Sequence, residues 1–234
     1  MLVVIEQRLR VRASLSRVIS ARLARLAGLI LLPLVLRATI PRASEGGFLL
    51  TDAISTRMLR RFLRQYTIHY PDLNSVDEIC AFDDRILERT ANVDSTLLTR
   101  RLVINNQIMR LLRKKSTSEL AGYYLLYPIN RECEMLIEDG RILKSSQITD
   151  DLICSGGARA ASLYLSMVYG VDRISQGFLI HLLYKDIREI IRKNPDMRSL
   201  FVRPVTPAGF RAVEKHEFKK FREDSGIFRR LISL

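Results

Sequence analysis

The chain has 234 residues, of which 47% are hydrophobic and 27% charged, so it can build one sizeable core and has the composition of a globular protein. Its formal net charge is +13, but the first 44 residues alone carry +7, from eight Arg and one acidic residue. The remainder is mildly basic and has neither zinc-finger spacing nor a basic helix interleaved with aromatics, so its pattern is not that of a nucleic-acid-binding domain.

Residues 1–45 form an Arg-rich extension that differs in composition from the rest. Their apolar run, 29–36, is interrupted by Pro33 and is far shorter than the roughly 20 residues that span a bilayer. Three interpretations stay open: an amphipathic helix on an anionic membrane surface, a targeting sequence, or a disordered extension from a start codon upstream of Met58. We favour the last and place the folded domain at 58–234.

The first half of the domain is expected to contain a strand, two helices and a hairpin. Apolar spacing from Val76 to Ile86 predicts a helix, which Asn74 or Ser75 can cap. Large apolar residues on both sides of the polar segment 114–118 predict an antiparallel hairpin. The expected ranges are strand 66–70, helices 74–87 and 96–103, and strands 107–113 and 121–129.

The second half is expected to alternate strands and helices after an irregular region at 130–159. A strand is followed by the loop 170–177 and by a helix with one apolar stripe, which Asn194 and Pro195 end. The expected ranges are strand 161–169, helix 178–193, strand 200–203, helix 207–215 and strand 217–221. This order predicts an α/β fold (α+β, with a mixed sheet).

The junction between the strand and the long helix is a candidate phosphate site. A helix that begins directly after a buried strand presents unpaired N–H groups and the positive end of its dipole. Gly177 lets a ligand approach the backbone, and Arg173 can add a charge-assisted contact. A glycine that only tightens the turn is an equally weighted alternative.

From about residue 75 to 218 the order and spacing of these elements resemble the GNAT superfamily of N-acetyltransferases. In that family a loop of the form Gln/Arg-x-x-Gly-x-Gly/Ala holds the CoA pyrophosphate. The aligned segment, 172–179, matches one of three signature positions, at Gly177. The second glycine falls on Leu179, and the leading Gln/Arg falls on Ile174.

The resemblance implies a GNAT-like acyl-CoA N-acyltransferase fold, a central mixed sheet flanked by helices, with acetyl-CoA as co-substrate and no metal. It places the cofactor on the end of the strand and the beginning of the helix. The residues that it implies for cofactor binding are Met167, Val168, Tyr169, Arg173, Ile174, Ser175, Gln176, Gly177, Phe178 and Leu179.

Acetyl transfer to an amine requires a base for the amine and a proton for the departing thiolate. The strand's backbone can polarise the thioester carbonyl. In the family a Tyr on the last helix often acts as general acid, but the aligned position here is Val213. The catalytic residues are therefore unassigned, with Tyr164, Tyr169 and Glu78 as candidates. Hairpin tyrosines and other acidic residues of the first helix are further candidates, namely Tyr123, Tyr124, Tyr127, Asp83, Asp84 and Glu88.

Cys80, Cys133 and Cys154 are widely spaced and include no CxxC pair, which argues against a disulfide framework or a structural zinc site and suits a reducing cytoplasm. The sequence thus predicts a cytoplasmic N-acyltransferase without a transmembrane segment, which transfers an acyl group directly to an unknown amine. Two alternatives stay open: a catalytically inactive CoA-binding or regulatory relative, and a basic protein that binds nucleic acid or a membrane surface.

Overall fold

The computed structural model describes residues 56–86, 94–156 and 158–232. These residues belong to one of two units into which contacts divide the chain, the unit formed by 46–48 and 54–234. The extension predicted at 1–45 lies outside the described residues. Its three interpretations and the boundary at residue 58 therefore stay predictions.

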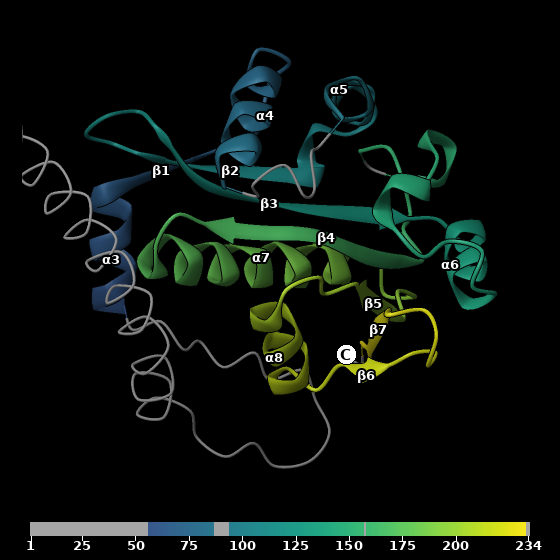
Figure 1. Cartoon of the computed structure of the whole chain (residues 1–234). Coiled ribbons are helices and arrows are strands. Elements are labelled where there is room, and N and C mark those ends of the chain that lie inside the picture. Colours follow the sequence, from purple (N-terminus) through teal and green to yellow (C-terminus); the bar gives the residue numbers. More distant parts are fainter. Residues whose placement is uncertain (1–55, 87–93, 157, 233–234) are drawn as a thin grey trace, which may run out of the picture. The chain divides into compact units, whose positions relative to one another are not determined.

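A seven-stranded mixed sheet forms the centre of this unit, in the order β1-β2-β3-β4-β5-β7-β6 (Figure 1). Neighbouring strands are antiparallel except for β4 and β5, which are parallel and joined through the long helix α7, as parallel neighbours require a crossover. The strands are β1 (Tyr66–His69), β2 (Met109–Lys114), β3 (Leu120–Ile129), β4 (Ser162–Gly170), β5 (Ser199–Val202), β6 (Lys219–Lys220) and β7 (Phe228–Leu231).

Helices cover both faces of the sheet, so that two buried clusters sandwich it. On one face α4 and α5 pack on the sheet through residues such as Phe82 and Leu98. On the other face α3 and α7 do so, and the rings of Phe62 and Phe178 lie 5.1 Å apart. The helices are α3 (Thr56–Gln65), α4 (Ser75–Ile86), α5 (Ser95–Ile104), α6 (Arg131–Glu138), α7 (Arg173–Lys193) and α8 (Pro207–Lys215), with short 3-10 turns η1 (Asn106–Ile108), η2 (Ser145–Gln147) and η3 (Asp150–Leu152).

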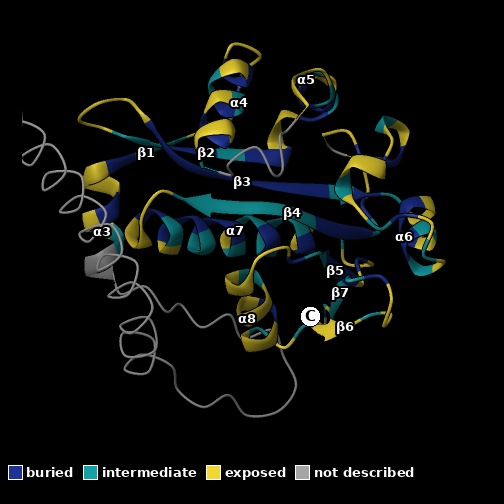
Figure 2. Ribbon diagram, viewed as in Figure 1, coloured by how far each residue is buried: buried dark blue, intermediate teal, exposed yellow. Residues whose placement is uncertain are grey.

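β3 is the most deeply buried strand (Figure 2). Successive side chains of β3 point alternately into the two buried clusters: Tyr123 faces α4 and α5, whereas Tyr124 faces α7. A strand that is covered on both faces reads as a continuous apolar run, which is the pattern that predicted a buried strand here. The predicted hairpin and mixed sheet are confirmed, and α8 has the predicted bounds.

Helix α3 and strand β7 are absent from the expected elements, and α7, α6 and β6 differ from the expectation. α7 begins at Arg173 rather than at residue 178, because Asp172 and Ser175 form a capping box one turn before Gly177. α6 lies in the region expected to be irregular, where the Asn130 side chain accepts from the N–H of Cys133. The last strand expected, at 217–221, is only two residues long as β6. It pairs with β7, which lies between β6 and β5 in the sheet.

Candidate functional site

The two halves of β4 have different neighbours. β3 pairs with the whole strand, with a register irregularity that leaves Ser166 opposite no β3 residue. β5 pairs only with the first half, from Ser162 to Leu165. The second half, from Ser166 to Gly170, therefore has a strand on one edge and none on the other. All five of its residues are half-buried (Figure 2).

Hydrogen bonds show which backbone groups face this open edge. The N–H of Val171 donates to the carbonyl of Ala121 on β3, at 2.9 Å. Alternate residues of a strand point to opposite edges, so Val168 and Gly170 face away from β3. The N–H and C=O of one residue in such a strand point to the same edge, so the N–H of Val168 also faces the open side.

Gln176, in the first turns of α7, occupies part of the open edge. Its side-chain oxygen accepts from the N–H of Gly170 at 2.6 Å, and its nitrogen lies 3.5 Å from the carbonyl oxygen of Val168. The side-chain amide thus stands where a neighbouring strand would otherwise supply partners. Gly170 makes the close approach of α7 feasible, because a Cβ there would lie 2.4 Å from the backbone nitrogen of Gln176.

The N-terminus of α7 is capped by its own chain. The Asp172 carboxylate accepts from the N–H of Ser175 at 2.7 Å, and the Ser175 hydroxyl lies 3.0 Å from the N–H of Asp172. The N–H of Gln176 donates to the carbonyl of Asp172. Asp172 therefore accepts from the N–H groups of Ser175 and Gln176, two donors that the sequence pattern assigns to a pyrophosphate. Fewer backbone N–H groups of α7 then remain available to a ligand.

Gly177 differs from Gly170, because a Cβ on it would meet no atom within 4 Å. A glycine inside a helix costs about 1 kcal/mol relative to alanine. Neither packing in the described part of the chain nor an unusual backbone conformation accounts for this glycine. A ligand that approaches the backbone here would account for it.

The residues predicted to bind the cofactor are contiguous in space but not equally accessible. Met167, Val168 and Tyr169 are half-buried on the second half of β4, and Arg173 and Ile174 are exposed at the start of α7. Three others have buried side chains, so that only their backbones could serve a ligand: Ser175, Phe178 and Leu179. These assignments stay predictions.

The three catalytic candidates lie in different places. Tyr164 is on the first half of β4, only 2% exposed, and burial raises the pKa of its hydroxyl to about 12. Tyr169 is on the open half and packs edge-on against Phe82, with ring centroids 6.0 Å apart. Burial raises the pKa of Tyr169 as well. Glu78 is on α4, opposite Arg113 of β2.

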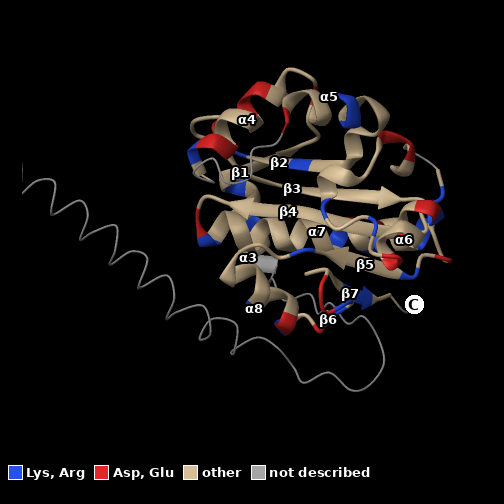
Figure 3. Cartoon of the chain, turned by 45° about the vertical axis from the view of Figure 1, so that its right-hand side comes forward, with Lys and Arg blue, Asp and Glu red and all other residues tan. Residues whose placement is uncertain are grey.

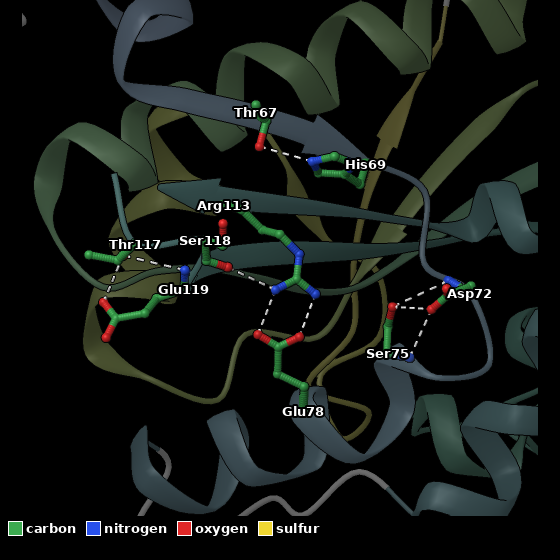
Figure 4. A network of polar contacts seen from close by, with 9 residues as sticks. All are labelled: Thr67, His69, Asp72, Ser75, Glu78, Arg113, Thr117, Ser118 and Glu119. Atoms are coloured by element: carbon green, nitrogen blue, oxygen red, sulfur yellow. Dashed lines mark hydrogen bonds and ion pairs between the residues drawn. The ribbon is translucent and has the colours of Figure 1, made fainter. Parts of the chain in front are cut away.

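Glu78 is held by an ion pair rather than presented to a substrate (Figure 4). Arg113 of β2 donates through both terminal nitrogens to the two carboxylate oxygens, and the Nη1–Oε1 distance is 2.6 Å. This contact raises the pKa of Arg113. The arrangement fixes α4 on β2 and gives Glu78 a structural role.

One turn further along α4, Asp83 reaches the middle of the sheet. Its carboxylate is 2% exposed and accepts from the Tyr123 hydroxyl, which is 2.7 and 2.8 Å from its two oxygens. The same hydroxyl lies 2.8 Å from the sulfur of Met167, on the open half of β4. The pKa of Asp83 is raised to about 6, because burial, with a smaller contribution from the nearby Asp84, outweighs the lowering effect of the Tyr123 hydrogen bond.

The Asp83–Tyr123 pair is thus a titratable carboxylate joined to a hydroxyl beside the candidate site. Sequence reasoning named both residues only within larger sets. The signal that separates Asp83 from Asp84 is helical position: Asp83 follows the buried Phe82 and lies one turn after the buried Ile79, on the inward side of α4.

α8 supplies no general acid at the aligned position, since Val213 is buried and carries no ionisable group. A contact between a Tyr and a His joins α7 to the end of α8: the Tyr184 hydroxyl of α7 is 2.8 Å from Nδ1 of His216. Burial, with Lys215 and Arg230 nearby, lowers the pKa of His216 to about 4. The imidazole is therefore neutral at pH 7.

Within the described ranges, no set of three or more His, Cys, Asp or Glu side chains is arranged to hold a metal ion. None of the helices in that part of the chain combines the length and the apolar character needed to cross a bilayer.

No protein-family model and no curated protein sequence matches the chain. Among solved structures it is similar to the loading GNATL domain of CurA from Lyngbya majuscula, at 11% identity over 71% of this chain and 97% of that one, with a TM-score of 0.48. A GNAT-family acetyltransferase from Staphylococcus aureus MU50 has 9% identity over 72% and 99%, with a TM-score of 0.47. Mosquito arylalkylamine N-acetyltransferase like 5b has 8% identity over 72% and 100%, with a TM-score of 0.46.

The first two of these structures carry GNAT in their names, the superfamily that the sequence resembles. Similarity at this distance carries no information on substrate or activity.

Proposed function

We propose that the chain is an acyl-CoA-dependent N-acyltransferase that transfers an acyl group, in the simplest case acetyl from acetyl-CoA, directly to an amine. The observation that carries this proposal is the open edge of β4 from Ser166 to Gly170, which leads straight into α7. An extended ligand that carries amide groups can pair with such an edge as a further strand would. The pantetheine arm of CoA is a ligand of this kind.

The open edge also offers a donor for the reacting carbonyl. The N–H of Val168 faces this side, next to the irregularity at Ser166. A thioester carbonyl seated there would accept this hydrogen bond, and the bond would strengthen as negative charge develops on the oxygen. The role needs no particular side chain, so it is compatible with the degenerate signature of this sequence.

Proton transfer would pass through Tyr123 and Asp83. The amine nitrogen attacks the thioester carbon, the C–S bond breaks, the amine loses one proton and the thiolate gains one. Burial, followed by the Asp83 carboxylate, raises the pKa of Tyr123, so its hydroxyl can give a proton to the thiolate only as it receives another one. Asp83, hydrogen-bonded behind it, would supply that proton in its protonated form. An Asp83 pKa of about 6 keeps part of this carboxyl protonated near neutral pH. The amine's proton would pass to water, and Asp83 would take up a proton from solvent before the next turnover.

The start of α7 supports a site for the pyrophosphate. Gly177 opens the helix surface to a ligand, and the helix dipole favours a negative group near this end. The Asp172 carboxylate at the N-cap opposes a phosphate placed on the helix axis. The phosphates would therefore bind at the side of the first turns, over Gly177.

A catalytically inactive CoA-binding relative is the second candidate. It is favoured by the buried Val213, which has no proton to give, and by the burial of both Asp83 and Tyr123. A cytoplasmic location, which the unpaired distribution of cysteines favours, remains part of the proposal in both cases.

The test is a titration with acetyl-CoA followed by calorimetry, and then a thiol-release assay with a panel of amines. If acetyl-CoA does not bind, both candidates are wrong. Binding without thiol release supports the inactive relative. If thiol is released, Tyr123→Phe should lower kcat by about a hundredfold or more, the scale of one general acid–base catalyst, with the Kd for acetyl-CoA unchanged.

Tyr124→Phe provides the matched control. Tyr124 is on the same strand and also donates to a carboxylate, that of Asp186, but on the opposite face of the sheet. Its removal should leave kcat unchanged apart from any loss of folded protein. Equal losses in the two variants would refute the role of Tyr123.

A further inference from the structure

A cavity of about 510 Å³ lies outside the site described above, where α3 ends, β1 begins and the β2–β3 hairpin turns. Basic residues occur at this end of the sheet (Figure 3). The cavity is lined by Arg64, Gln65, Tyr66, Lys114, Lys115 and Ser116. Every one of these side chains can donate a hydrogen bond, and three are cations.

Within the part of the chain that the structure describes, the three cations of the cavity have no carboxylate partner. Among the described residues, neither Arg64 nor Lys114 nor Lys115 forms an ion pair, in contrast to Arg113, which is engaged by Glu78 (Figure 4). Like charges gathered without counter-ions repel one another, and an anion among them removes this repulsion. Arg60 and Arg61, exposed on α3, add to the positive field at this end.

The backbone that carries these side chains is held in place. The N–H of Lys115 donates to the carbonyl of Gln65 at 2.8 Å, which ties the hairpin to the end of α3. The hairpin turn itself is closed by bonds from Ser118 to Lys114 and from Lys114 to Glu119, at 2.8 and 3.0 Å. A binding site built on fixed backbone loses less entropy when it binds a ligand.

Two carboxylates lie on elements next to the residues that line the cavity. The Tyr66 hydroxyl is hydrogen-bonded to Asp172 of the α7 cap; burial, followed by this carboxylate, raises the pKa of Tyr66. Glu119, on the hairpin, accepts from the Thr117 hydroxyl at 3.1 Å. Both carboxylates already accept hydrogen bonds from other side chains. Arg64 and Lys115 therefore stay available to bind an anionic ligand.

We propose that this cavity is a phosphate-binding site, separate from the β4 edge, which takes a phosphate-bearing small anion or the headgroup of an anionic lipid. Its volume falls within the usual range of ligand sites and exceeds the needs of a single phosphate. Arg64 supplies the planar donor pair that matches phosphate oxygens, and the two lysines supply point charges. The site does not depend on the proposed acyl transfer.

The experiment uses the full chain with two probes, inorganic pyrophosphate in calorimetry and vesicles of phosphatidylcholine with or without phosphatidylglycerol in co-sedimentation. Lys114→Gln/Lys115→Gln should weaken binding by about tenfold or more, since each charged hydrogen bond contributes about that factor. Lys219→Gln/Lys220→Gln is the matched control: it removes the same charge from adjacent exposed lysines on β6. Arg64→Gln is a second variant, should the double substitution lower the melting temperature.

Binding of pyrophosphate that the cavity variant loses and the control keeps supports the site for a free phosphate compound. The same pattern only with phosphatidylglycerol vesicles supports it for a lipid headgroup. The proposal is overturned if the wild type binds neither probe, or if the cavity variant and the control bind alike. Acetyl-CoA also carries phosphates, so its titration is repeated on the Lys114→Gln/Lys115→Gln variant. Acetyl-CoA binding that this variant keeps does not depend on the cavity, and failure of one proposal is then distinguishable from failure of the other.

Discussion

The two halves of β4 belong to one strand but differ in what surrounds them. The first half has β3 on one edge and β5 on the other, and its residues from Ser162 to Tyr164 are buried. The second half has β3 alone, and its residues are half-buried. One half therefore stabilises the fold, whereas the other presents backbone donors and acceptors at a free edge.

The difference shows how a core strand can also carry a site. A free edge of unpaired backbone groups is a liability in a sheet, because it can pair with another chain. Here α7 turns back against the edge so closely that only glycine fits at position 170, and Gln176 supplies a side-chain amide in place of a strand. The edge is thus covered by a group that a ligand can displace.

The largest expected effect is a difference in the free energy of unfolding between substitutions in the two halves of β4. Leu163→Ala, in the first half, should lower the free energy of unfolding by about 3 kcal/mol, because Leu163 is fully buried and a cavity would remain. Val168→Ala, on the same face in the half-buried part, should cost about 1 kcal/mol. Urea unfolding of the two variants measures both. Equal losses would show that the open half is as tightly packed as the paired half.

A comparable effect is expected from Asp83→Asn, but it depends on pH. The pKa of Asp83 is raised to about 6 in the folded state from 3.8, so folding favours its protonated form. This carboxyl therefore destabilises the wild type progressively as the pH rises from about 4 through 6. Asp83→Asn should match the wild type near pH 4 and exceed its free energy of unfolding by up to about 3 kcal/mol at pH 7.

Urea unfolding at several pH values tests this, with Asp77→Asn as control. Asp77 is exposed on the same helix, so its substitution should change stability by a constant amount or not at all. A difference between Asp83→Asn and the wild type that stayed constant with pH would contradict the burial argument. It would also weaken the role of Asp83 in proton transfer.

The smallest expected effect concerns the cover of the open edge. Gln176→Ala removes a competitor for the N–H of Gly170, so acetyl-CoA should bind several-fold more tightly, by about the net value of one hydrogen bond. Calorimetry measures this, with Gln107→Ala, exposed in η1, as control. Unchanged affinity in Gln176→Ala would mean that the ligand does not use this edge, and no binding by any variant would refute the proposed function itself.

Much of the fold could be predicted from the sequence because its signals are local. The apolar run of β3 predicted a buried strand, and the apolar stripe along α7 predicted an amphipathic helix. The beginning of α7 was predicted too late. Asp172 followed by Ser175 three residues later is itself a capping signal, so the sequence contained the means to place it.

The sequence by itself determined the hairpin, the strand and long helix around Gly177 and the helix α8, but not α6 or β7. The tertiary structure decided which acidic residue on α4 matters, because α4 crosses the sheet: it sets Glu78 on Arg113 of β2 but brings Asp83 to Tyr123 and Met167. It also decided where β5 ends beside β4, and hence which part of the strand is open. Local patterns report periodicity and caps, whereas these contacts join residues dozens of positions apart, and only the folded chain brings them within hydrogen-bond distance.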